Sequence, residues 1–316
     1  MITLNKNKNF PASIHDALLI MSDLSPSGIL ALKILRQYLP EDLPILLVVG
    51  ESTIDKTQLG INIMTNYGYK NFNILSGNAT DKNYPEGIVY PSKGIMSITK
   101  VWLSIESFLV YYNSPLIIGL YSLHGLMNIS RKILQKCVLL MYGSYSLRCM
   151  YLNIDIPSTV SFINDSFKHV VLYESFYATG LQNSYILKDC DDVSLIKATK
   201  LYNKYALDDA LNVIEITAKK MLDTEEMDKK ELSVKNCERL NRNMKIVSNI
   251  ITSNYRHIIM ADFCLILYAF NTMKTSKAIR GNITVNQNEY TEIVHSDSGR
   301  VYLVKDVNCD ELLSLL

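Results

Sequence analysis

Three carboxylates stand at positions in the sequence where an acidic side chain needs a specific partner. Asp23 ends an apolar run and precedes a Ser/Pro turn, and Glu51 follows the next apolar run along the chain. Asp262 lies inside the apolar segment HIIMADFCLILYAF, where a buried carboxylate without a partner is costly. We expect the partner of Asp262 to be a cation, the start of a helix, or a side chain such as His257 or Lys100.

Each of these groups also has an explanation that involves no chemistry. Asp23 could cap the helix expected after the turn, with Ser25 and Ser27 as rival caps. Glu51 would suit the first turn of a helix because of the helix dipole. His124 could act as an acid or a ligand, or simply hydrogen-bond within a loop. The segment SPSG lacks the glycine spacing of a phosphate-binding loop, and we find no ordered Ser/His/Asp or Cys/His set.

The elements that must position these residues alternate between strands and helices over the first 180 residues. Short, nearly continuous apolar runs such as ALLIMSD, LPILLVVG and KCVLLMYG are typical of strands buried on both faces of a parallel sheet. Segments with helical spacing separate them. We therefore predict an α/β fold, with a doubly wound, mostly parallel Rossmann-like sheet and helices on both faces. Ligands in such sheets bind beyond the carboxyl ends of the strands.

The segment from about 192 to 257 differs from the rest of the chain. Helix-forming residues dominate it, charges cluster in DTEEMDKKE, and it shows no strand pattern. We predict two or three surface helices here, within a single domain that spans residues 1–316, because no Pro/Gly/Ser linker separates the segment from its neighbours. The tail GRVYLVKDVNCDELLSLL predicts one strand followed by a short helix.

Composition and charge exclude several classes of protein. The 316 residues include 32 Lys+Arg and 31 Asp+Glu, a formal net charge of +1, and 48% are hydrophobic, which is typical of a globular protein and not of a disordered or fibrous one. Six cysteines without a CxxC pair predict buried free thiols and no disulfide scaffold. Nucleic acid is a less favoured partner, since the basic stretch KNCERLNRNMK has the spacing of a solvated helix face.

The sequence also predicts where the protein acts. The N-terminal segment has no signal-like apolar stretch, and no apolar run reaches the roughly 18 residues that span a bilayer. We therefore expect an intracellular, cytoplasmic protein without membrane association. The abundance of Asn, Ile, Lys and Tyr suits an AT-rich genome such as that of a parasite or a large virus, so a viral protein carried in the virion is one expected setting.

Several motifs, in this order, resemble those of the nucleoside hydrolase family over nearly the whole chain. MSDLSPSGILAL is similar to the family's DxDxGxDDAxAL, and LLVVGESTIDK to its VVGN followed by a helix. LYSLHGL loosely matches a GPLTN turn, and VLLMYGSY matches VVLMGGG. LNIDIPSTVSFINDSFKHVVLYESF resembles NIxxDPEAAxxVFNS, and MADFCLILYAF resembles HDPCAVAYVID. The resemblance implies a nucleoside hydrolase-like fold, in which Arg280 and Gly281 match a turn before the last strand.

Members of this family cleave the N-glycosidic bond of a ribonucleoside with a bound Ca²⁺, so the resemblance implies an ion site of hard oxygen ligands. Position by position, Asp23 and Asp262 are retained. The other matched positions carry different residues from the family, namely Met21, Ser27, Gly28, Glu51 and Ala261. The Thr of the GPLTN turn falls near His124, and the residues that contact the ribose fall near Cys149 and Tyr151. Two retained carboxylates are too few for a strong Ca²⁺ site, and the thioether of a Met gives this ion almost nothing.

We therefore predict a catalytically inactive, nucleoside hydrolase-like pseudoenzyme without a cofactor, used as a structural or protein-interaction component. Its remnant metal site would consist of Asp23, Asp262 and Glu51. One alternative is an active Ca²⁺-dependent purine or pyrimidine nucleoside N-ribohydrolase, in which these carboxylates hold the ion and His124 assists the leaving base. The other alternative is a module that binds a nucleoside without turnover.

The resemblance also implies oligomers, because relatives usually assemble as dimers or tetramers. We expect a homo-oligomer or a protein partner. The 20 tyrosines are candidates for interface contacts, since Tyr is enriched at interfaces.

Overall fold

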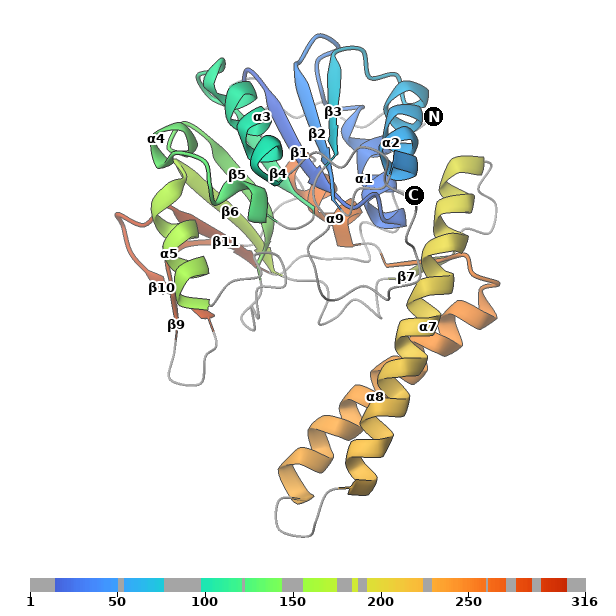
Figure 1. Ribbon diagram of the computed structural model, residues 1–316. Helices are drawn as coiled ribbons and strands as arrows, with labels where there is room; N and C mark the ends of the chain where they lie inside the picture. Colours follow the sequence, from blue (N-terminus) through green and yellow to red (C-terminus); the bar gives the residue numbers. More distant parts are fainter. Residues whose placement is uncertain are drawn as a thin grey trace. The chain divides into compact units, whose positions relative to one another are not determined.

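The computed structural model describes residues 15–50, 54–76, 98–120, 123–143, 156–174, 184–186, 192–223, 229–259, 261–270, 277–285 and 291–305. The chain divides into two compact units (Figure 1). The first comprises Met1–Asn83, Val89–Phe176 and Ala261–Leu316, and the second comprises Tyr84–Ile88 and Tyr177–Met260. That the whole chain forms one domain stays a prediction.

The first unit is built on a mostly parallel sheet. Within the described part of the chain it has nine strands in the order β10-β9-β11-β6-β5-β4-β1-β2-β3. The strands from β3 to β11 in this order run parallel to one another, whereas β9 and β10 are antiparallel to their neighbours. Their bounds are β1 Leu18–Ser22, β2 Ile45–Val49, β3 Phe72–Ser76, β4 Leu116–Gly119, β5 Val138–Gly143, β6 His169–Glu174, β9 Lys277–Val285, β10 Thr291–His295 and β11 Val301–Lys305. The predicted α/β class and the mostly parallel sheet are confirmed.

Helices cover both faces of this sheet. Figure 1 shows α3, α4 and α5 on one side and α1 and α9, which contact each other, on the other side. The bounds are α1 Pro26–Leu35, α2 Ile54–Asn66, α3 Ile98–Val110, the 3₁₀ helix η2 His124–Leu126, α4 Arg131–Leu134, α5 Ile156–Ser166 and α9 Ala261–Phe270. All five residues of β1 and of β2 are buried, as expected of strands covered on both faces.

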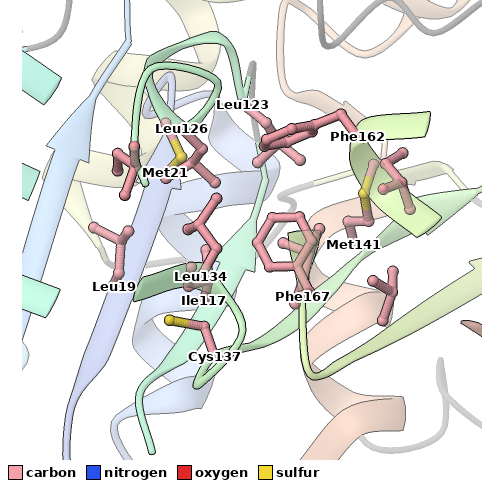
Figure 2. Packing of buried hydrophobic residues seen from close by; sticks show 14 of the residues in the cluster. Leu19, Met21, Ile117, Leu123, Leu126, Leu134, Cys137, Met141, Phe162 and Phe167 are labelled. Atoms are coloured by element: carbon pink, nitrogen blue, oxygen red, sulfur yellow. The ribbon is translucent and has the colours of Figure 1, made fainter. Parts of the chain in front are cut away.

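The core between the sheet and α3 to α5 is apolar throughout (Figure 2). Leu19 and Met21 from β1 point into it, because alternate residues of a strand share a face. Phe167, which follows α5, is 0% exposed and meets Phe162 edge to face, with ring centroids 5.4 Å apart. This arrangement adds a favourable aromatic contact to the free energy gained by burial.

The segment around Arg280 and Gly281 is a strand and not the expected turn. Arg280 and Gly281 match a turn in the resembled family, but they lie within β9. A Cβ on Gly281 would overlap the main-chain carbonyl of Val294 in β10, so the close approach of these strands needs a glycine. The alternation of Gly281 and Ile283, which are buried, with Asn282 and Thr284, which are exposed, is a strand signal that the turn interpretation overlooked.

The second unit contains two long helices and a small sheet. The helices are α7 (Val193–Asp223) and α8 (Lys229–Thr252), and they occupy the segment predicted to be helical. The strands β7 (Ser184–Ile186) and β8 (His257–Ile259) pair antiparallel and were not predicted. None of the helices in the described ranges is long and apolar enough to cross a membrane.

Two of the six cysteines have described side chains, and they differ. Cys137 is a free, buried thiol, as predicted, and burial raises its pKa to about 12. Cys237 is free but exposed on α8, so the prediction is wrong for this residue. Cys149, Cys190, Cys264 and Cys309 lie outside the described side chains.

Truncation of Phe167 tests the core of the first unit. We expect Phe167→Ala to lower the free energy of unfolding by about 3–5 kcal/mol, because it removes a fully buried ring and leaves a cavity. Urea unfolding followed by fluorescence of Trp102 measures this, since the only tryptophan lies on α3 in the first unit. The neighbouring exposed residue provides the control, Lys168→Ala, with a change within about 0.5 kcal/mol. Equal effects of the two variants would contradict this description of the core.

Candidate functional site

The strand order places a ligand-binding position next to β1. The parallel strands β3, β2, β1, β4, β5 and β6 have the 3-2-1-4-5-6 order of doubly wound folds, whose order reverses between β1 and β4. Ligands in such folds bind beyond the carboxyl ends of the strands at this reversal. Asp23 directly follows β1, and η2 follows β4. Asp23 therefore lies at the carboxyl end of β1, beside the reversal in strand order, as expected from the sequence.

Asp23 is used in the turn between β1 and α1. Its Oδ1 accepts a hydrogen bond of 2.9 Å from the backbone N–H of Ser25, and the Ser22 hydroxyl accepts one of 3.1 Å from the N–H of Leu24. Leu24 has a φ of 55°, a left-handed conformation that is uncommon for leucine. Its buried side chain lies close to Gly60 of α2, where an added Cβ would be 3.4 Å from Leu24 Cδ1. Local hydrogen bonds and packing therefore stabilise this turn.

Ser25 is the N-cap of α1, which decides among the three caps considered from sequence. Its hydroxyl oxygen accepts from the N–H of Gly28 at 3.3 Å, and Pro26 occupies the first helical position. Proline suits that position because its fixed φ matches the helix and no hydrogen-bond donor is lost there. Neither Asp23 nor Ser27 caps α1.

Asp262 joins the start of α9 to the start of α1. Its side chain is only 6% exposed, and Oδ2 accepts a 3.2 Å hydrogen bond from the hydroxyl of Ser25. In return, the backbone N–H of Asp262 donates to Ser27 Oγ at 2.9 Å. Each helix thus supplies a polar group to the N-terminus of the other. We call this arrangement of Ser25, Ser27 and Asp262 the α1–α9 cap.

The α1–α9 cap explains how a carboxylate is accommodated in an apolar environment. Helix N-termini carry a partial positive charge, and Asp262 lies in the first turn of α9 while bonding to the N-cap of α1, whose own first turn has no acidic residue. Of the partners considered from sequence, the start of a helix is the one that the structure shows. The side chains of His257 and Lys100 lie outside the described ones.

Gly28 is required by the close approach of these groups. A Cβ at this position would lie 2.8 Å from Ser22 Oγ, 3.4 Å from Ser25 Oγ and 3.6 Å from Asp262 Oδ2. The first distance is too short for a real contact. An aspartate, which the resembled family has here, would need the space that the Ser22 hydroxyl occupies.

Met21 lies on the opposite face of β1 from Ser22. Its side chain is 4% exposed and belongs to the apolar cluster, near Leu123 and Leu126 (Figure 2). An added Cβ on Gly125 would lie 3.9 Å from Met21 Cε. The Met21 side chain therefore packs in the apolar core and supplies no oxygen ligand where the resembled family has an aspartate.

These residues do not fit a calcium ion. Ca²⁺ takes roughly six to eight oxygen ligands at about 2.3–2.6 Å. Around Asp262, the Ser25 hydroxyl donates to the carboxylate and accepts from α1, Ser27 accepts from α9, and Gly28 has no side chain. Among the residues whose placement is described, no three His, Cys, Asp or Glu side chains are grouped in a way that could hold a metal.

The other site residues proposed from sequence cannot be placed with Asp23 and Asp262. Glu51, Cys149 and Tyr151 lie outside the described residues. His124 is the first residue of η2, which follows β4, one of the two strands that flank the reversal in strand order. Its side chain is outside those described. Conversely, the roles of Ser22 in the turn and of Ser25 as partner of Asp262 were missed. Ser25 and Asp262 are 237 positions apart, and no local pattern pairs them.

Comparison with known proteins adds no assignment, because no protein-family model and no curated protein matches the chain.

A methyl group at position 28 tests how closely α1 packs against Ser22 at the end of β1. Gly→Ala in a helix usually stabilises by up to about 1 kcal/mol, but we expect Gly28→Ala to destabilise the first unit by about 1–3 kcal/mol, because the methyl would collide with Ser22 Oγ. Urea unfolding followed by Trp102 fluorescence measures the change.

Two further variants make this test specific. Gly60→Ala in α2 is the matched control, since its Cβ would meet only side-chain carbons at 3.4 Å and should cost less than Gly28→Ala. Ser22→Ala should reduce the cost of Gly28→Ala in the double variant by removing the colliding oxygen. A stabilising effect of Gly28→Ala, or additive effects of the two changes, would show that α1 is packed less tightly against Ser22 than described.

Proposed function

We propose that this protein is a nucleoside hydrolase-like protein without hydrolase activity, which serves as a structural or protein-interaction component. The observation that carries this proposal is the α1–α9 cap. The carboxylate of Asp262, which would correspond to an ion ligand of the resembled family, accepts a hydrogen bond from the Ser25 hydroxyl instead, and the backbone N–H of the same residue donates to Ser27 Oγ.

Two features support descent from a nucleoside hydrolase-like scaffold. The strand order of the parallel sheet reverses next to β1, where such a fold would hold its ligand. Asp23 and Asp262, the two retained carboxylates, are far apart in sequence but both hydrogen-bond to Ser25, one to its backbone N–H and one to its hydroxyl.

The chemistry of glycoside cleavage argues against turnover. The reaction of the resembled family needs a metal that polarises a water and a carboxylate that deprotonates it as positive charge develops on the sugar. Here the matched positions hold Met21 in the apolar core, Ser27 as a cap of α9, and Gly28 with no side chain. None of these groups can hold a calcium ion or act as a general base at neutral pH.

Calcium and nucleoside titrations test this proposal directly. We expect no heat of Ca²⁺ binding in calorimetry, no hydrolysis of inosine or uridine with or without Ca²⁺, and no change in melting temperature with either nucleoside. A ligand present at 100 times its dissociation constant would stabilise the native state by about 2.7 kcal/mol, which a thermal shift detects.

The alternatives give different results. Ca²⁺ binding together with nucleoside hydrolysis that EGTA abolishes would overturn the proposal in favour of an active N-ribohydrolase, and loss of both in Asp262→Ala would locate the ion. A rise in melting temperature with a nucleoside, but without hydrolysis, would overturn it in favour of a nucleoside-binding module.

A further inference from the structure

One face of the sheet is open at the end formed by β6, β11, β9 and β10. On the side of α5, the side chains of these strands are buried, as Val170, Ile283 and Val301 show. On the opposite side, the side chains are half-buried or exposed. They are His169 and Val171 of β6, Tyr302 of β11, Arg280, Asn282 and Thr284 of β9, and Val294 of β10. Because alternate residues of a strand share a face, these side chains form one surface, which we call the open sheet face.

Positive charges gather at one end of the open sheet face. Arg280 lies directly across from Tyr302 in the pairing of β9 with β11. Arg300 immediately precedes β11, and Lys168 immediately precedes β6. All three basic side chains are exposed. Burial, and then the charges of Lys168, Arg280 and Arg300, lower the pKa of His169, so the three cations converge on this one ring.

These three cations are not neutralised within the described part of the chain. Arg280 and Arg300 each donate one hydrogen bond to a neutral main-chain carbonyl, at 2.8 and 3.4 Å, respectively. No acidic side chain among the described residues pairs with Lys168, Arg280 or Arg300. Asp297, in the loop before Arg300, lies 3.9 Å from His295 Nε2 instead. The whole chain has a net charge of only +1, so this local excess of positive charge fits a negatively charged partner.

Aromatic rings lie among these charges and narrow the choice of partner. Arg280 Cζ lies over the Tyr302 ring, 5.6 Å from its centre, and the His169 ring meets Tyr302 edge to face at 5.7 Å. Unpaired bases stack on guanidinium groups and on Tyr and His rings. The bases of a duplex are already paired and stacked, and an acidic peptide has no bases, so neither partner uses the rings. The combination of cations and rings therefore favours a single-stranded nucleic acid.

The size of the charged end also suits a short single-stranded segment. Neighbouring strands are about 4.8 Å apart, so β6, β11 and β9 together span about 10 Å between Cα atoms. The step from Arg300 to Tyr302 along β11 adds about 7 Å. Sheet surfaces that bind RNA in other folds stack two or three bases on an area of this scale.

We infer that the open sheet face binds single-stranded nucleic acid, with Lys168, Arg280 and Arg300 contacting phosphates and with Tyr302 and His169 stacking on bases. The basic stretch of α8, at which the sequence disfavours nucleic acid, is a different surface in the second unit. The open sheet face has its charges at the amino ends of β6 and β11, whereas the α1–α9 cap follows the carboxyl end of β1. The inference is therefore independent of the proposed function, and either can fail alone.

Fluorescence anisotropy of labelled single strands of about 12 nucleotides, mixed with the full chain, tests this inference. DNA and RNA strands are both used, because phosphate contacts and stacking do not require the 2′-OH. Three phosphate contacts predict a slope of about −2 in log K against log salt concentration, so binding at about 50 mM salt should weaken roughly twentyfold at about 200 mM. Lys168→Gln should bind more weakly at the lower salt concentration and should lose only about sevenfold over the same range, because one contact is gone.

A matched control separates this surface from general charge effects. Lys132 is exposed on α4, on the side of the sheet opposite to the open sheet face, and pairs with no described acidic residue. Lys132→Gln removes the same charge and should bind as the wild type does. Tyr302→Leu keeps all the charges, so it should lower the affinity at least about fivefold without changing the salt slope. Urea unfolding followed by Trp102 fluorescence verifies that each variant is folded.

Other polyanions provide the remaining comparisons. We expect a duplex of the same sequence and polyglutamate to bind more weakly than the single strand, because neither offers unpaired bases. The absence of single-strand binding at about 50 mM salt would overturn the inference. Equal effects of Lys168→Gln and Lys132→Gln, an unchanged affinity of Tyr302→Leu, or duplex or polyglutamate binding as tight as that of the single strand would also overturn it.

Discussion

A carboxylate buried in an apolar environment has to be satisfied, and much of the first unit follows from how Asp262 is satisfied. Its carboxylate lies in the first turn of α9 and accepts a hydrogen bond from the N-cap of α1, so it lies at the positive ends of two helix dipoles. The same contact holds α1 and α9 together. Beside this contact, the Ser22 hydroxyl leaves no room for a side chain at position 28, and it also stabilises the left-handed Leu24.

The α1–α9 cap stands where a doubly wound fold usually binds its ligand. The carboxyl end of β1, beside the reversal in strand order, offers backbone N–H groups and two helix starts. A ligand or an ion can use these groups, but so can the side chains of the protein itself. In this chain, Ser25, Ser27 and Asp262 use them, which turns the position into part of the structural framework. An acidic residue at such a place therefore does not by itself indicate catalysis.

Much of the fold could be predicted from local patterns, whereas the site could not. The apolar runs of β1, β2 and β5 predict strands, because strands buried on both faces require continuous apolar sequence. The hairpin of β9 and β10 was missed, since Arg280 and Gly281 were interpreted as a turn although Gly281 belongs to the alternation of buried and exposed residues in β9. The role of Asp23 depended on the local turn, and that of Asp262 on a serine 237 positions away, so only the folded chain reveals their partners. The exposed position of Cys237 likewise follows from which side of α8 packs on α7.

The most direct test of the central claim is the unfolding free energy of Asp262→Asn relative to the wild type, measured by Trp102 fluorescence in EGTA and again in Ca²⁺. A carboxylate that stabilises helix starts is needed whether or not metal is present, so the account predicts a loss of about 2 kcal/mol in both conditions. A carboxylate kept for an ion repels its acidic neighbours when the ion is removed. A neutral or stabilising effect in EGTA, with a loss only in Ca²⁺, would contradict the account.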